Sequence, residues 1–191
     1  MTKKNLLMLV IILCLAALAY ITLTTGPSSP PPLPSFQSPG ASPAGGKQKI
    51  EAPDFTLETL DGKSTSLSSL KGQVVILNFW SASCGPCLIE MPALTKLASA
   101  MSGKPFTILG ITPDPKAEAA YAAKELRLNF PVLLDSTARV ASAYGVSATP
   151  ETFIIAPDGT VDNMVLGAAN WADPSVIEYM NKLLPSSTAP R

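Results

Sequence analysis

The chain of 191 residues contains no histidine. This absence removes the commonest general base, the Ser–His and Cys–His nucleophilic pairs, and the commonest metal ligand. Charged residues make up only 15% of the chain, with 14 basic and 14 acidic side chains, so the composition indicates no nucleic acid or other phosphate-rich partner. Any chemistry must therefore come from cysteines, carboxylates or hydroxyls.

Cysteine is also scarce, with three in the whole chain: Cys14, Cys84 and Cys87. A secreted domain that relied on structural disulfides would carry more cysteines at wider spacings. A zinc site would need two further Cys or His ligands beside the Cys84–Cys87 pair, and the only other cysteine lies in an apolar run. We therefore predict no metal site, and we interpret Cys14 as an apolar packing residue.

The N-terminal segment, residues 1–25, is predicted to be a membrane anchor or a signal peptide. Lys3 and Lys4 precede an uncharged run from Leu6 to Leu23, which as a helix would extend over roughly 27 Å, close to the thickness of a bilayer core. The two lysines favour a cytoplasmic N-terminus, which places the rest of the chain on the far side of the membrane. Cleavage after Ala19 is the alternative, and both interpretations export the domain that follows.

Residues 26–49 are rich in Pro, Ser and Gly, and we interpret them as a linker, extended where proline is dense. Residues 50–185 are predicted to form the globular domain, and residues 186–191 a short tail. This division leaves one compact domain with a single core.

Within the domain, hydrophobic patterns predict alternating strands and helices. Asp61-Gly62 between 55–57 and 64–67 is typical of a β-hairpin turn, and the continuous apolar run 74–80 is typical of a strand buried on both faces. The remaining predicted strands are 106–111, 131–134, 151–156 and 160–166, and the predicted helices are 84–101, 116–126, 138–144 and 174–184. This order predicts an α/β fold with a mixed central sheet flanked by helices and an added N-terminal hairpin.

The two-residue spacing of Cys84 and Cys87 at a predicted helix start has a chemical consequence. The unpaired N–H groups and the dipole at the helix N-terminus favour an anion, so Cys84 is expected to be the acidified nucleophile. Cys87, one turn further along, is placed to attack a mixed disulfide formed at Cys84. Between them Pro86 fixes φ and donates no N–H, which stiffens the loop that it forms with Gly85.

Three stretches of the sequence, Asn78–Cys87, Glu90-Met91-Pro92 and Ala148–Ile155, resemble the TlpA/ResA branch of membrane-tethered thioredoxins. The resemblance covers residues 52–184. It implies a thioredoxin-like fold and thiol-disulfide exchange with no cofactor beyond the redox-active Cys84–Cys87 pair. It also implies a cis peptide at Thr149-Pro150, in a loop that faces the dithiol and whose backbone helps to bind substrate.

The supporting residues follow from the same comparison. Trp80 belongs to the motif, and Asn78 stands where thioredoxins proper carry an aspartate. Asn78 cannot accept a proton, so we interpret it as a buried amide that ties strands together, which leaves Glu90 or water to serve Cys87. Glu90 is expected to be either a solvated helix residue or such a proton carrier. Ser83 replaces the aromatic residue that commonly precedes the first cysteine, so no hydrophobic shelf for substrates is expected from that position.

Three functions remain open from the sequence. The first is a reductase of disulfides in exported proteins, with apocytochrome c favoured because residues 150–153 also look like the cytochrome c maturation thioredoxins; a membrane thiol-electron carrier would then regenerate it on the periplasmic side. The second is a peroxiredoxin-like peroxidase, against which Leu77 stands where that site has proline. The third is a Cu(I)-binding chaperone that uses the two thiolates.

Overall fold

The computed structural model describes residue 17 and residues 49–185. The predicted membrane segment apart from residue 17, Cys14, the linker apart from residue 49, and the tail therefore lie outside the described residues. In the described stretch, no helix has the length and apolar character needed to cross a membrane.

Within residues 49–185 the strands form a single mixed sheet. The strands are β1 (Thr56–Thr59), β2 (Ser64–Ser66), β3 (Val74–Phe79), β4 (Phe106–Thr112), β5 (Val132–Leu134), β6 (Glu151–Ile155) and β7 (Val161–Leu166). Their order across the sheet is β2-β1-β5-β4-β3-β6-β7. β4 pairs in parallel with β3 and β5, and the other neighbours are antiparallel. The predicted mixed sheet and the N-terminal hairpin are confirmed, with Gly62 at φ +84° in the hairpin turn.

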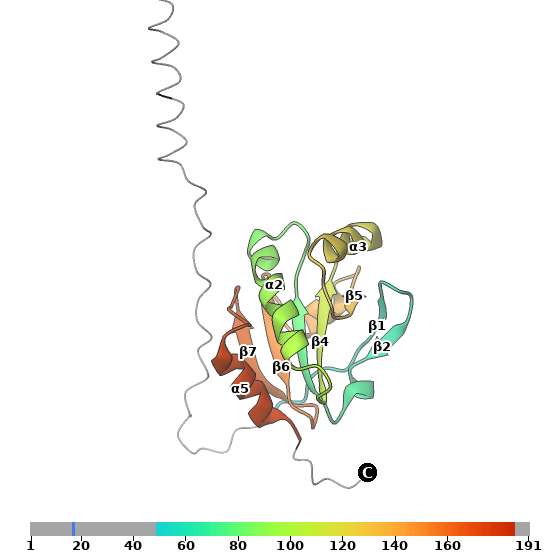
Figure 1. Ribbon diagram of the computed structural model, residues 1–191. Helices are drawn as coiled ribbons and strands as arrows, with labels where there is room; N and C mark the ends of the chain where they lie inside the picture. Colours follow the sequence, from blue (N-terminus) through green and yellow to red (C-terminus); the bar gives the residue numbers. More distant parts are fainter. Residues whose placement is uncertain (1–16, 18–48, 186–191) are drawn as a thin grey trace, which may run out of the picture. The chain divides into compact units, whose positions relative to one another are not determined.

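Helices cover both faces of this sheet (Figure 1). They are α2 (Gly85–Ala100), α3 (Lys116–Glu125), α4 (Arg139–Ala143) and α5 (Pro174–Leu183), with a short 3₁₀ turn at Ser68–Leu70. Buried side chains of α2, α3 and α5 pack against one face of the sheet, whereas Val140 of α4 packs against the other. The fold is therefore the predicted thioredoxin-like arrangement of a central sheet between helices.

The central strand β3 shows why the sheet has two cores. All six of its residues are buried, as the continuous apolar run predicted. Val74 and Ile76 belong to the core beneath α2, while Val75, Leu77 and Phe79 belong to the opposite core. Asn78 is the one polar residue on this strand, and the alternation places it on the α2 face.

Helix α2 begins at the end of the loop that leaves β3. Cys84 is its N-cap residue, in an extended conformation, and a proline occupies the first turn, where a missing N–H costs nothing. The predicted start at the cysteines is confirmed, and Met91, Leu94 and Leu97 form its buried face. The parallel pairing of β3 with β4 brings the ends of both strands to the same edge of the sheet as this helix start.

Candidate active site

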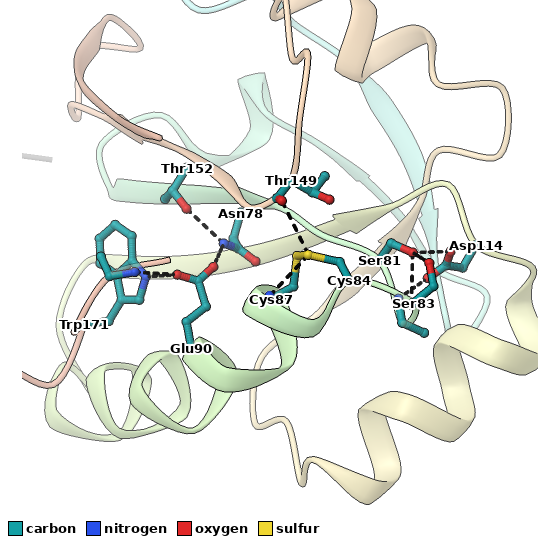
Figure 2. The surroundings of a disulfide bond; sticks show 12 residues. Asn78, Ser81, Ser83, Cys84, Cys87, Glu90, Asp114, Thr149, Thr152 and Trp171 are labelled. Atoms are coloured by element: carbon teal, nitrogen blue, oxygen red, sulfur yellow. Dashed lines mark hydrogen bonds between the residues drawn. A yellow bond between two sulfur atoms is a disulfide. The ribbon is translucent and has the colours of Figure 1, made fainter. Parts of the chain in front are cut away.

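Cys84 and Cys87 are joined by a disulfide at the N-terminus of α2, with their Cα atoms 5.3 Å apart (Figure 2). The backbone N–H of Cys87 donates to Cys84 Sγ at 3.2 Å, so the helix start directs a donor at this sulfur. Cys87 has no solvent-exposed area, whereas Cys84 is half-buried. Only the first sulfur of the pair is therefore open to a molecule from solution.

The second sequence motif lies directly against this disulfide. The Thr149-Pro150 peptide bond is cis, as the resemblance implied. The carbonyl oxygen of Thr149 lies 3.4 Å from Cys84 Sγ, although 65 residues separate them in the chain. The fold thus brings together the two motifs, with Thr149 exposed beside the reachable sulfur and Pro150 buried.

Asn78 ties three elements together behind the dithiol. Its Nδ2 donates to Glu90 Oε1 on α2 at 2.8 Å and to Thr152 Oγ1 on β6 at 2.9 Å. The side chain is fully buried, which agrees with the predicted role of a buried amide linking strands. Its Oδ1 has no hydrogen-bond partner among the described residues.

Glu90 is buried, so the expectation of a solvated helix residue is wrong. Its carboxylate accepts three hydrogen bonds, from Asn78, from the backbone N–H of Ala169 at 3.1 Å and from Trp171 Nε1 at 2.8 Å. Figure 2 shows the carboxylate turned toward Asn78 and Trp171 rather than toward the sulfurs. Burial raises the pKa of Glu90 above its ordinary value of 4.5, and the three hydrogen bonds only partly oppose that shift.

The burial of Glu90, but not the identity of its partners, could have been suspected from helical spacing. Cys87, Glu90, Leu94 and Leu97 follow one another at intervals of three and four, which puts Glu90 on the buried face of α2. Trp171 is one of only two tryptophans in the chain, and a buried tryptophan usually finds an acceptor for its N–H. Its pairing with Glu90 across 81 residues has no local sequence signal.

Asp114, a carboxylate that no sequence motif singles out, anchors the loop before Cys84. Asp114 accepts from Ser81 Oγ at 2.9 Å and from the backbone N–H of Ala82 at 2.6 Å, and Ser81 Oγ lies 3.0 Å from Ser83 Oγ (Figure 2). Asp114 follows β4 and Ser81 follows β3. Their meeting is a consequence of the parallel pairing of these strands at one edge of the sheet.

The other predicted supporting residues lie where their chemistry suggests. Gly85 and Pro86 form the exposed first turn of α2 between the cysteines. Trp80 is fully buried, and a Cβ atom placed on Gly110 would lie 3.0 Å from its Nε1. Trp80 is therefore part of the packing beneath the site, with no surface offered to a substrate.

Comparison with known proteins agrees with this geometry. The model of the AhpC/TSA family matches residues 49–164. The thiol-disulfide oxidoreductase ResA of Bacillus subtilis is 36% identical over 149 residues, which cover 75% of this chain and 82% of that protein. The ResA of Geobacillus thermodenitrificans is 33% identical over 135 residues, covering 70% and 76% of the two chains. A thiol:disulfide interchange protein of the thioredoxin family from Chlorobium tepidum superposes with a TM-score of 0.64 at 28% identity, covering 72% of this chain and 98% of that one.

Proposed function

The chain belongs to the AhpC/TSA family and is a thiol-disulfide oxidoreductase similar to ResA, and from this premise we propose that Cys84 and Cys87 reduce disulfides of exported proteins. The observation that carries the proposal is the asymmetry of the pair: one sulfur is reachable at a helix N-terminus and its partner is enclosed behind it. This asymmetry assigns a separate step to each cysteine.

In the first step the reduced Cys84 attacks the substrate. Its thiolate forms a bond to one substrate sulfur, the substrate disulfide breaks, and the other substrate sulfur leaves as a thiolate. The Cys87 N–H, which donates to Cys84 Sγ at 3.2 Å, and the helix dipole favour the thiolate over the thiol. The backbone of the Thr149-Pro150 loop, beside Cys84, is positioned to bind the substrate chain.

In the second step Cys87 resolves the mixed disulfide. It loses its proton and attacks Cys84 Sγ, the Cys84–Cys87 bond forms, and the second substrate sulfur leaves with the electron pair of the broken bond. The proton from Cys87 neutralises a departing substrate thiolate. Two electrons thus pass from the enzyme to the substrate, and the Cys84–Cys87 disulfide is the product form of the enzyme.

The proposed location is supported by the sequence outside the described domain, and the proposed substrate by a motif within it. Lys3, Lys4 and the apolar run that follows support an anchored domain on the periplasmic side, with a secreted form if the chain is cleaved after Ala19. The motif at residues 150–153 supports apocytochrome c as a substrate. A membrane thiol-electron carrier then reduces the Cys84–Cys87 disulfide for the next cycle.

Trapping of mixed disulfides tests the assignment of the two sulfurs. Cys87→Ser should accumulate covalent complexes with exported proteins, because its mixed disulfide cannot be resolved, whereas Cys84→Ser should trap none. Non-reducing electrophoresis followed by mass spectrometry identifies the trapped partners. Equal trapping by both variants would contradict the separate roles of the two sulfurs, and rapid peroxide consumption without insulin-disulfide reduction would favour the peroxidase alternative.

A further inference from the structure

A groove of about 560 Å³ lies beside the dithiol, between the start of α2 and one face of α3. We refer to it as the α3 groove. Ala82, Ser83 and Leu88 form one wall, and Glu118, Tyr121 and Glu125 lie on the other. Ser83, in one wall of the groove, lies on the same side of Cys84 as Ser81 and Asp114, and the network of Asn78, Glu90 and Trp171 lies on the opposite side of the disulfide (Figure 2).

Two residues that line the α3 groove, Ser83 and Leu88, are close to the reactive Cys84. Ser83 directly precedes Cys84, and Leu88 is one helical turn beyond it, with its backbone N–H bonded to Cys84 O at 3.1 Å. Side chains four apart on a helix have Cβ atoms about 6 Å apart, and an extended peptide covers about 7 Å in two residues. A substrate residue two positions from a cysteine bound to Cys84 therefore reaches the groove.

The two walls are fixed to each other by Asp114, which lies two residues before α3. Its carboxylate holds Ser81 Oγ and the Ala82 N–H of the opposite wall. Ala82 and Leu88 also pack against the same core to which Ala122 of α3 belongs. The two walls of the groove are therefore linked by hydrogen bonds and by a shared core.

The residues that line the groove indicate which side chains it can bind. Most of the lining is apolar, and Tyr121 stands with 69% of its area exposed. Glu118 and Glu125 frame the groove at positions i and i+7 on α3, with Tyr121 between them, and no lysine or arginine in the described part of the chain lines it. An apolar side chain followed by a cation matches this surface, because the cation pairs with the carboxylates and stacks on the tyrosine ring.

The small side chain of Ser83 keeps the groove open to Cys84. A bulky aromatic residue at this position, in the wall of the groove, would take up part of its volume. The apolar surface for a substrate is therefore supplied by α3, through Tyr121, and not by the residue before the first cysteine.

Resting on the proposed function, we propose that the α3 groove binds the substrate polypeptide next to its disulfide, with an apolar side chain against Tyr121 and a lysine or arginine against Glu118 and Glu125. This oxidoreductase therefore prefers substrates that carry apolar and basic residues near the reacting cysteine.

The test compares two short peptides, each carrying one cysteine as a mixed disulfide with thionitrobenzoate. In the first peptide a Leu lies two residues from the cysteine on each side, with a Lys beyond each Leu. In the second peptide Ser replaces each Leu and Glu replaces each Lys. Reduced full-length protein is mixed with each peptide, and release of thionitrobenzoate gives the second-order rate constant of the reaction. Ellman's reagent, which is too small to fill the groove, serves as the disulfide that reports on the dithiol alone.

The native protein should prefer the Leu–Lys peptide by about tenfold, the effect of burying one apolar side chain and pairing one charge. Tyr121→Ser and Glu118→Lys should each reduce this preference to about threefold or less. Tyr121→Ser should leave the rate with Ellman's reagent unchanged, whereas Glu118→Lys should raise it, because that reagent carries two carboxylates. Met164→Ser and Glu178→Lys make the same kinds of change at exposed positions outside the groove, and both should keep the native preference.

Equal peptide preference in the native protein and in Tyr121→Ser, with Ellman's reagent still reduced, would overturn the groove and leave the proposed function standing. Failure of the native protein to reduce Ellman's reagent would overturn both. A native dimer that Tyr121→Ser converts to a monomer, with unchanged peptide preference, would assign the groove to a second copy of the chain and refute the proposal.

Discussion

Replacement of Glu90 is the sharpest test of the network behind the dithiol. Glu90→Ala removes the acceptor of three buried hydrogen bonds, donated by Asn78 Nδ2, Ala169 N and Trp171 Nε1. At about 1 kcal/mol for each bond, the free energy of unfolding should fall by about 3 kcal/mol. This loss is smaller than that expected on breaking a buried ion pair. Removal of Glu90 also removes the unfavourable free energy of desolvating its carboxylate.

Glu90→Gln should cost much less, about 1 kcal/mol. The amide oxygen of glutamine can keep the bonds from Ala169 and Trp171, and its NH₂ group then faces Asn78. Rotation of the Asn78 amide presents Oδ1, which has no partner among the described residues of the native protein, to that new donor. In this rotated state the Thr152 hydroxyl can donate to the same Oδ1, so the network closes again.

The contribution of Glu90 to the free energy of unfolding should change with pH in a defined direction. The pKa of Glu90 in the folded protein is raised above 4.5, chiefly by burial, so its contribution to stability is fully present below pH 4.5 and is lost as pH rises through the folded pKa. Glutamine does not titrate. The free energy of unfolding of the native protein relative to Glu90→Gln should therefore fall as pH rises from 4.5 toward neutrality.

Urea unfolding of the oxidised proteins at a series of pH values, followed by the fluorescence of Trp80 and Trp171, measures both effects. Glu90→Asp is the matched control, because it keeps the charge but withdraws the carboxylate by one methylene. Parallel pH profiles for the native protein and Glu90→Gln, or an alanine variant as stable as the native protein, would refute the buried network.

Further predictions concern packing beneath the site. Gly110→Ala should lower the free energy of unfolding by about 1–3 kcal/mol in thermal unfolding, because its Cβ would lie 3.0 Å from Trp80 Nε1 and 3.3 Å from Phe130 Cε2. Gly85→Ala, with no atom within 4 Å of its Cβ, should cost far less. Equal losses in the two variants would disprove the close approach. Thr152→Val should lower the free energy of unfolding by about 1 kcal/mol, because Asn78 loses the acceptor at 2.9 Å, and a shifted urea midpoint at constant slope is the measurement that checks it.

Much of the fold could be predicted because its signals are local. The continuous apolar run of β3, the Asp-Gly turn of the first hairpin and the cysteine pair at the start of α2 each identify an element without knowledge of its neighbours. The place of β5 between β1 and β4 could not be predicted. It depends on strands that are far apart in the sequence, and a strand of three residues carries too little pattern to specify its partners.

The site divides in the same way. The dithiol and the Thr149-Pro150 loop were found from their motifs, and the role of Asn78 followed from its amide side chain, which cannot accept a proton. The burial of Glu90 was missed, since a charged residue on a helix is ordinarily solvated and its donors lie 79 and 81 residues away. Asp114 was missed because only strand pairing brings it to the loop at residues 81–83.

The complete enclosure of Cys87 has a kinetic consequence. The molecule that donates electrons and the molecule that receives them must both react at the same atom, Cys84 Sγ, and so cannot occupy it together. Turnover follows a ping-pong scheme, in which the substrate disulfide reacts with the reduced enzyme and the electron donor reacts with the oxidised enzyme. A double-reciprocal plot at several concentrations of reductant should give parallel lines, and an excess of either reactant should inhibit.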